Sequence, residues 1–133
     1  MKQKAKIRIM LVEDEAITAL AMNLALENMG FATTEPVATG RRALELLAVD
    51  RPDVVLMDIN LTGEMDGIET ACRIRRHSSV PIIFISGYCS GEVLARAQAL
   101  GPSAIFVKPV RPEELREAIE SAARKLCGTD RPH

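Results

Sequence analysis

Short apolar runs alternate along the chain with longer segments in which apolar residues recur at helical spacing. The short runs are too short for helices and are predicted to be strands at residues 7–12, 33–37, 54–57, 82–85 and 104–107. The continuous apolar run at 54–57 is typical of a parallel strand that is buried on both faces. Pro36 interrupts the run at 33–37, which favours an edge position for that strand.

The segments between these strands predict helices at 16–29, between Thr39 and Pro52, at 68–76, at 93–100 and from Pro112 onward. Three of the helices show clear apolar spacing. The residues concerned are Ile17, Leu20, Ala21 and Leu24 in the first helix, Ala43, Leu44, Leu47 and Ala48 on the inner face of the second, and Leu115, Ala118, Ile119, Ala122 and Leu126 on one face of the last.

Five consecutive strand–helix units indicate an α/β fold. Right-handed crossovers between parallel strands place helices on both faces of the sheet. Because the second strand has an edge-like sequence, we expect a five-stranded parallel sheet in the flavodoxin-like order 2-1-3-4-5. The 133 residues fit one domain, which we expect at residues 1–127, followed by a short C-terminal tail at 128–133.

Composition and charge exclude several classes of function. Lys and Arg total 17 against 18 Asp and Glu, so there is no basic excess for binding nucleic acid. Aromatic residues are only 3% of the chain, which leaves few side chains to stack on bases or on a flavin. The three cysteines form no Cys-x-x-Cys pair, and no apolar run reaches about 18 residues. We therefore expect a cytoplasmic protein with reduced thiols and no membrane span.

Acidic, hydroxyl and amine side chains follow four of the five predicted strands. Glu13 and Asp14 follow the first strand, Asp58 the third, Ser86 the fourth and Lys108 the fifth. Each of them alone has an ordinary explanation, such as a helix cap, a turn residue or a solvated lysine. In a parallel sheet, however, the carboxyl ends of the strands meet at one edge, so we expect these groups to converge.

Three carboxylates in such a small space repel one another. At a separation near 5 Å and an effective dielectric near 20, each pair costs about 3 kcal/mol. A divalent cation would offset this repulsion, and oxygen ligands without His or Cys favour Mg²⁺. A carboxylate held by Mg²⁺ beside a lysine and a hydroxyl suits phosphoryl transfer, with the carboxylate as nucleophile.

Five short segments, in this order and at these spacings, form a specific signature. They are Leu11-Val12-Glu13-Asp14-Glu15, Val55-Leu56-Met57-Asp58-Ile59, Met65-Asp66-Gly67, Ser86 after Phe84-Ile85, and Val107-Lys108-Pro109. With these segments the chain resembles the receiver domain of two-component response regulators, from about residue 7 to residue 126.

The resemblance implies that Asp58 accepts a phosphoryl group from a phosphohistidine on a sensor histidine kinase or phosphotransfer protein. It implies Mg²⁺ as the cofactor, held by Asp14, Asp58 and the backbone carbonyl of Asn60, with Glu13 acting through water. Lys108 resembles the lysine that contacts the phosphoryl group, and the resemblance implies a cis peptide bond before the proline that follows it.

Further roles are implied for the residues that read out and time the signal. Ser86 resembles the switch hydroxyl, and Ile105 stands where the family often has an aromatic switch residue. Phe106, one residue later, is expected on the opposite face of its strand. Asn60 and Tyr88 occupy positions that tune dephosphorylation in the family.

The loop from Asp58 to Gly67 departs from the pattern of chemotaxis-type receivers. It is one residue longer, and Thr62 replaces a frequent proline. The resemblance also implies a protein that accepts phosphoryl groups stoichiometrically rather than an enzyme. We expect Mg²⁺-dependent self-phosphorylation and slow autodephosphorylation only.

The partners implied are the phosphodonor protein and a downstream protein target that binds the face formed by the fourth helix, fifth strand and fifth helix. A direct nucleic-acid or membrane partner is not expected. A phosphorylation-dependent homodimer stays open, as does whether the chain is a stand-alone regulator or a fragment of a larger or hybrid protein.

Three other interpretations fit the sequence less well. A haloacid-dehalogenase-type hydrolase needs a second Asp two residues after the first, where this chain has Asn60. In a flavodoxin-like cofactor carrier, Glu13, Asp14 and Glu15 would repel the phosphate. A phosphorylation-independent adaptor is disfavoured because every active-site position is filled. One phosphoryl group retained per chain, as opposed to continuous turnover, separates a receiver from a hydrolase.

Overall fold

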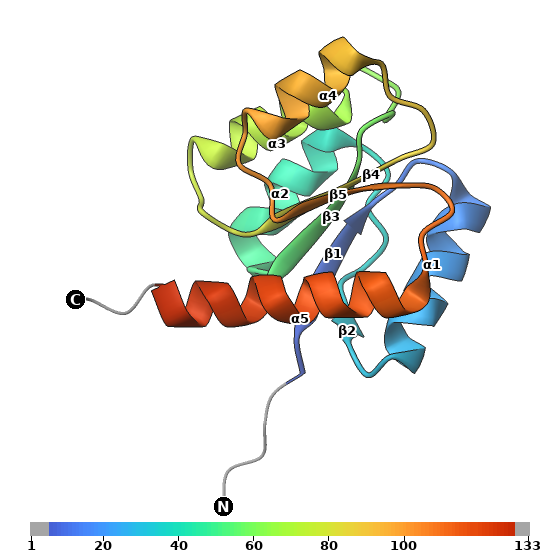
Figure 1. The fold of residues 1–133 in the computed structure, drawn as a ribbon, viewed down its shortest axis with the longest axis vertical. Coiled ribbons are helices and arrows are strands. Elements are labelled where there is room, and N and C mark those ends of the chain that lie inside the picture. The colour runs from blue at the N-terminus through green and yellow to red at the C-terminus, as the bar shows by residue number, and fades with distance from the viewer. Residues whose placement is uncertain (1–5, 130–133) are drawn as a thin grey trace, which may run out of the picture.

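The computed structural model describes residues 6–129, with side chains up to residue 124, as strands and helices in strict alternation (Figure 1). The strands are β1 (Arg8–Val12), β2 (Ala32–Thr33), β3 (Val54–Asp58), β4 (Ile82–Ser86) and β5 (Ala104–Val107). The helices are α1 (Ala16–Asn28), α2 (Gly40–Asp50), α3 (Gly67–Arg75), α4 (Gly91–Gln98) and α5 (Pro112–Thr129). The predicted packing of Leu126 and the thiol of Cys127 lie outside the described side chains.

The strands form one parallel sheet in the order β2-β1-β3-β4-β5, so the predicted fold class is confirmed. Every residue of β3 and β4 is buried, as expected for central parallel strands. β2 is shorter than predicted, and Val37 pairs with Val12 only through an isolated β-bridge. Pro36 lies between these two pairings, and it has no N–H to donate to a ladder.

The core has two layers, one on each face of the sheet, and helices cover both faces (Figure 1). Helices α2, α3 and α4 pack on one face, and α1 and α5 pack on the other. Side chains alternate between the two layers along each strand. In β5, Ile105 packs against the layer of α2–α4 and Phe106 against the layer of α1 and α5. The prediction that these neighbours point to opposite faces is confirmed.

Helix α1 forms where predicted, but the apolar stripe used to predict it faces solvent. Ile17, Leu20 and Leu24 are 84%, 62% and 53% exposed. A second stripe contains Ala19 and Leu26, which are buried against the sheet. Because nine of the thirteen residues of this helix are apolar, helical spacing alone does not identify the inner face.

Helix α2 packs through a stripe that is turned slightly from the predicted one. Ala43, Leu44 and Leu47 contact the core as expected, whereas Leu46 is buried and Ala48 is exposed. At the other end of the chain, α5 runs to Thr129 and so includes two residues assigned above to the tail. None of the helices within residues 6–129 is both long and apolar enough to span a membrane.

The loop after β3 folds back onto the strand that it leaves. Asp66 caps α3 by accepting a hydrogen bond from the N–H of Glu69 at 2.8 Å. The N–H of Gly67 donates to the carbonyl of Ile59 at 3.2 Å. A Cβ atom on Gly67 would overlap the carbonyl oxygen of Asp58 and lie 2.8 Å from the Cα of Ile59. Gly67 is therefore required by a close approach of two backbone segments.

Gly67→Ala is expected to destabilise the protein by about 2–3 kcal/mol, because backbone atoms must shift to admit the new methyl group. Gly91→Ala is the matched control, since Gly91 also opens a helix but a Cβ there meets nothing within 4 Å. The control is expected to be neutral or stabilised by up to about 1 kcal/mol. Urea denaturation of both variants measures the difference, and equal stabilities would contradict the close approach.

Candidate functional site

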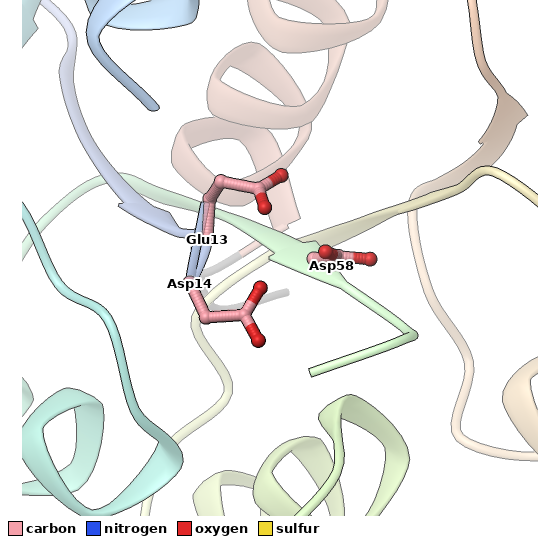
Figure 2. Close-up of side chains that lie close together, drawn as sticks. All are labelled: Glu13, Asp14 and Asp58. Atoms are coloured by element: carbon pink, nitrogen blue, oxygen red, sulfur yellow. The ribbon is translucent and has the colours of Figure 1, made fainter. Parts of the chain in front are cut away.

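Three carboxylates gather where β1 and β3 end. Glu13 and Asp14 directly follow β1, and Asp58 is the last residue of β3 (Figure 2). One carboxylate oxygen from each residue lies within 4.8 Å of the others. Glu13 and Asp58 are buried, and Asp14 is half-buried. The structure thus brings together the three acidic residues that the sequence predicts at this edge.

Strand pairing accounts for this convergence. β1 and β3 are parallel neighbours, with Val12 opposite Met57. The next position along each strand is therefore Glu13 on one and Asp58 on the other. The remaining positions of both strands carry apolar side chains that enter the core, apart from Arg8 at the far end of β1. Acidic residues are accommodated only at the sheet edge, where the backbone leaves the core.

Lys108 brings one positive charge to the cluster from the end of β5. Its Nζ lies 3.2 Å from Oε1 of Glu13 and 3.9 Å from Oδ2 of Asp58. Its primary partner is therefore Glu13, and its contact with Asp58 is the longer one. The Lys108–Pro109 peptide bond is cis, as expected. A single ammonium group leaves the three carboxylates incompletely balanced.

The surroundings of Glu13 and Asp14 push their pKa values in opposite directions. Burial raises the pKa of Glu13, and the neighbouring Asp58 raises it further. The N–H of Glu15 and the ammonium of Lys108 oppose that shift. The pKa of Asp14 is lowered, chiefly because its carboxylate accepts a hydrogen bond from the Thr62 hydroxyl. The negative charge is thus less favoured on Glu13 than on Asp14.

Asn60 connects Asp58 to the loop after β4. Its backbone N–H donates to Oδ1 of Asp58 at 2.9 Å. Its side-chain oxygen lies 3.0 Å from Oγ of Ser86, and that hydroxyl also lies 2.7 Å from the carbonyl oxygen of Tyr88. The Asn60 amide completes the network by donating to the same Tyr88 carbonyl at 3.2 Å. The two loops are therefore joined next to Asp58.

The remaining predicted positions lie around this network. Ser86 is completely buried at the end of β4, whereas the side chain of Tyr88 is 77% exposed. Ile105 lies opposite Phe84 in the sheet and is half-buried. The parts assigned to these residues in switching and in dephosphorylation, and to the Asn60 carbonyl as a metal ligand, stay predictions.

Sequence reasoning missed a contact between Thr62 and the cluster. The Thr62 hydroxyl and backbone N–H both donate to Oδ2 of Asp14, at 2.6 and 3.1 Å. The sequence indicated only that Thr62 stands at a position where proline is frequent. This departure concerned the path of the loop and did not indicate a contact with Asp14.

The cluster fits a divalent cation on the chemistry of its donors. The three carboxylates offer only oxygen atoms, which hard cations such as Mg²⁺ prefer. The negative charge exceeds what Lys108 supplies, and the pKa of Glu13 is already raised. An added cation would relieve this imbalance, so the residues present suit Mg²⁺.

Comparison with known proteins extends this description. Residues 9–120 match the family model of the response regulator receiver domain. The chain is 30% identical over 119 residues to the transcriptional regulatory protein PdtaR of Mycobacterium tuberculosis, covering 90% of this chain and 58% of that protein. It is 29% identical over 114 residues to sporulation initiation phosphotransferase F of Bacillus subtilis, covering 85% and 90%. The chain thus spans little more than half of the first relative and most of the second.

Solved structures show the same likeness. The signal receiver domain of a modulated diguanylate cyclase from Desulfovibrio desulfuricans superposes with a TM-score of 0.86 at 33% identity, covering 91% of this chain and 96% of that one. A CheY-like receiver domain protein from Methanospirillum hungatei gives a TM-score of 0.83 at 26% identity, with coverages of 91% and 96%. The fold around the acidic cluster is therefore shared with these proteins over most of their length.

Asp58→Asn is expected to stabilise the protein by about 1–2 kcal/mol at pH 7 in EDTA, because it removes two repulsive pairs and only one attraction, that to Lys108. Asparagine still accepts the hydrogen bond from Asn60. Urea denaturation measures the gain, with the exposed loop variant Glu64→Gln as a neutral control.

The gain is expected to shrink as the pH falls. Because the pKa of Glu13 is raised, the folded wild-type protein binds that proton more tightly than the unfolded chain does. The stability that the wild-type protein gains from this proton is fully present below the pKa that Glu13 has in the unfolded chain. It is lost as the pH rises through the pKa that Glu13 has in the folded protein. Below that range the wild-type cluster repels itself less, so the two proteins converge. A variant no more stable than wild type at pH 7 would contradict repulsion in the cluster.

Proposed function

Because this chain belongs to the response regulator receiver domain family, we propose that it accepts a phosphoryl group on Asp58 and signals through a conformational change. The phosphodonor is a phosphohistidine on a sensor histidine kinase or phosphotransfer protein, in the cytoplasm. The single observation that carries the proposal is the cluster of Glu13, Asp14 and Asp58 with Lys108 at its side.

Asp58 is suited to act as the nucleophile. Its carboxylate is buried, and the N–H of Asn60 fixes its orientation by holding Oδ1. In the transfer, a carboxylate oxygen bonds to phosphorus while the bond from phosphorus to the donor imidazole nitrogen breaks. The product is an acyl phosphate, and the imidazole leaves with the electron pair. Lys108, within 4 Å of Asp58, offsets charge on the phosphoryl oxygens.

Glu13, Asp14, Asp58 and the carbonyl of Asn60 would hold Mg²⁺, with Glu13 acting through water. When bound, Mg²⁺ supplies neutralisation of the negative charge on the transferring phosphoryl group. The protein contributes orientation and burial, because both Glu13 and Asp58 are held by backbone N–H groups. Accepting one phosphoryl group per chain, with only slow hydrolysis, makes this a stoichiometric acceptor. Asn60, whose N–H holds Asp58, and the exposed Tyr88 set the rate of that hydrolysis.

Ser86 provides the link from the acceptor to the surface. Its hydroxyl is engaged by the carbonyl of Tyr88 and the side chain of Asn60. A phosphoryl group on Asp58 offers charged oxygen acceptors, which form stronger hydrogen bonds than neutral ones. When Ser86 turns to the phosphoryl group it releases Tyr88, and the loop leading to α4 moves. Ile105, half-buried in the adjacent strand, adjusts to that movement.

The output surface proposed here is formed by α4, β5 and α5. β5 is the outer strand of the sheet, and Val107 on it is 64% exposed. A downstream protein, or a second phosphorylated copy of the chain, binds this face. Because the chain spans only 58% of PdtaR, any activity that depends on the rest of such a regulator lies beyond this domain.

The exposed stripe of α1 suits the phosphodonor protein. Helix α1 begins two residues after Asp14, so a protein that delivers a phosphoryl group to Asp58 covers the start of this helix. Ile17, Leu20 and Leu24 then become buried at the interface. Exposure of these apolar side chains to water is unfavourable in the isolated domain. A bound phosphodonor protein would remove them from water.

Acetyl phosphate with Mg²⁺ is expected to add one phosphoryl group per wild-type chain and none to Asp58→Asn, as measured by intact mass. EDTA abolishes the labelling. Asp66→Asn is the matched control, because asparagine caps a helix as well as aspartate does and Asp66 is exposed. Labelling of Asp58→Asn would place the acceptor elsewhere, and continuous release of phosphate would indicate a hydrolase.

Leu20→Asp is expected to slow phosphotransfer from a phosphohistidine donor protein by about tenfold or more, because it introduces a charge into the apolar interface. Labelling by acetyl phosphate stays unchanged, since that small donor needs no docking surface. Val49→Asp on α2, where Val49 is 78% exposed, is the control and keeps both activities. Phosphotransfer from the donor protein to Leu20→Asp at the wild-type rate would show that α1 is not the docking surface.

A further inference from the structure

Thr62 holds the most exposed of the three carboxylates. Its hydroxyl donates to Oδ2 of Asp14 at 2.6 Å, and its backbone N–H donates to the same oxygen at 3.1 Å. The two residues are 48 positions apart, so these bonds join the loop after β3 to the loop after β1. Both of these hydrogen bonds use Oδ2 of Asp14.

The local backbone permits both donors to reach Asp14. Gly63 adopts a φ of +102°, a left-handed conformation that L side chains rarely adopt, and it turns the chain directly after Thr62. Thr62 itself has a backbone N–H. A proline at this position would lack that N–H as well as the hydroxyl. Relative to proline, threonine therefore offers two donors, and both are used by Asp14.

Asp14 needs such support more than its neighbours do. Glu13 is held by the Glu15 N–H and Lys108, and Asp58 by the Asn60 N–H. Asp14 is only half-buried, so repulsion from the two buried carboxylates favours rotamers that point into solvent. The two bonds from Thr62 oppose that rotation and keep Asp14 within 4.8 Å of the others.

We propose that Thr62 is a positioning residue for the cation site: it fixes Oδ2 of Asp14 and leaves the second carboxylate oxygen available to the cation. This inference rests on the proposed function, because it requires Mg²⁺ to bind at the cluster. Thr62 does not touch the phosphoryl group. Its effect is on the affinity for Mg²⁺ and reaches phosphorylation only through that affinity.

The test is isothermal titration of the full chain with Mg²⁺, free of other divalent cations, at fixed pH and ionic strength. Thr62→Val, which keeps the backbone N–H but removes the hydroxyl, is expected to weaken Mg²⁺ binding by about tenfold. Thr62→Ser keeps both donors and restores an affinity within about twofold to threefold of wild type.

A second readout separates positioning from a general loss of structure. In acetyl phosphate labelling, the Mg²⁺ concentration at half-maximal rate rises for Thr62→Val, while the rate at saturating Mg²⁺ stays within about twofold of wild type. Thr18→Val is the matched control, because the Thr18 hydroxyl bonds Glu15 at 2.9 Å near the same edge without touching Asp14. Its Mg²⁺ affinity is expected to equal that of wild type.

The outcomes distinguish this inference from the proposed function. If wild type binds Mg²⁺ and Thr62→Val binds it as tightly as Thr62→Ser does, Thr62 does not position Asp14. Tighter binding by Thr62→Val would overturn the inference in the other direction, because Thr62 would then compete with the cation. If wild type binds no Mg²⁺ and is not labelled, the proposed function fails, and this inference fails with it.

Discussion

The repulsion among three carboxylates is the constraint around which this domain is organised. Parallel pairing of β1 and β3 places Glu13 beside Asp58, and the chain has no freedom to separate them without breaking the sheet. Individual charges and N–H dipoles of neighbouring residues oppose this repulsion. Lys108 and the N–H of Glu15 hold Glu13, whereas the N–H of Asn60 holds Asp58. The compensation is incomplete, and this imbalance suits the edge to a cation.

The same pairing explains why the site and the core do not interfere. The buried parts of β1, β3 and β4 are almost entirely apolar, and they separate two packed layers of helices. Polar side chains begin only where the strands end, so charge at the edge is supported by a rigid apolar platform. The loops above that platform are joined through Asn60, Ser86 and the Tyr88 carbonyl. Under the proposed function, a change at Asp58 therefore reaches α4 through a few hydrogen bonds rather than through repacking of the core.

Much of this arrangement could be predicted because it depends on chain order and strand ends. The strand order followed from the edge-like sequence around Pro36, and the convergence of Glu13, Asp14 and Asp58 followed from parallel pairing. The inner face of α1 could not be predicted, since nine of its thirteen residues are apolar and they form more than one stripe. The contacts of Thr62 and Gly67 could not be predicted either. They depend on the path of the loop after β3, which is set by tertiary approach and not by periodicity.

The position of Lys108 has a consequence for how the acceptor works under the proposed function. Its ammonium lies 3.2 Å from Glu13 but 3.9 Å from Asp58, so its closest ion pair is with a residue that does not react. A lysine bonded tightly to Asp58 would stabilise the nucleophile in its ground state and so oppose the transfer. Held by Glu13, it stays near enough to meet the phosphoryl oxygens once they arrive. Glu13 thus holds the ammonium of Lys108 beside the acceptor, where this charge stabilises the phosphorylated state more than the unphosphorylated one.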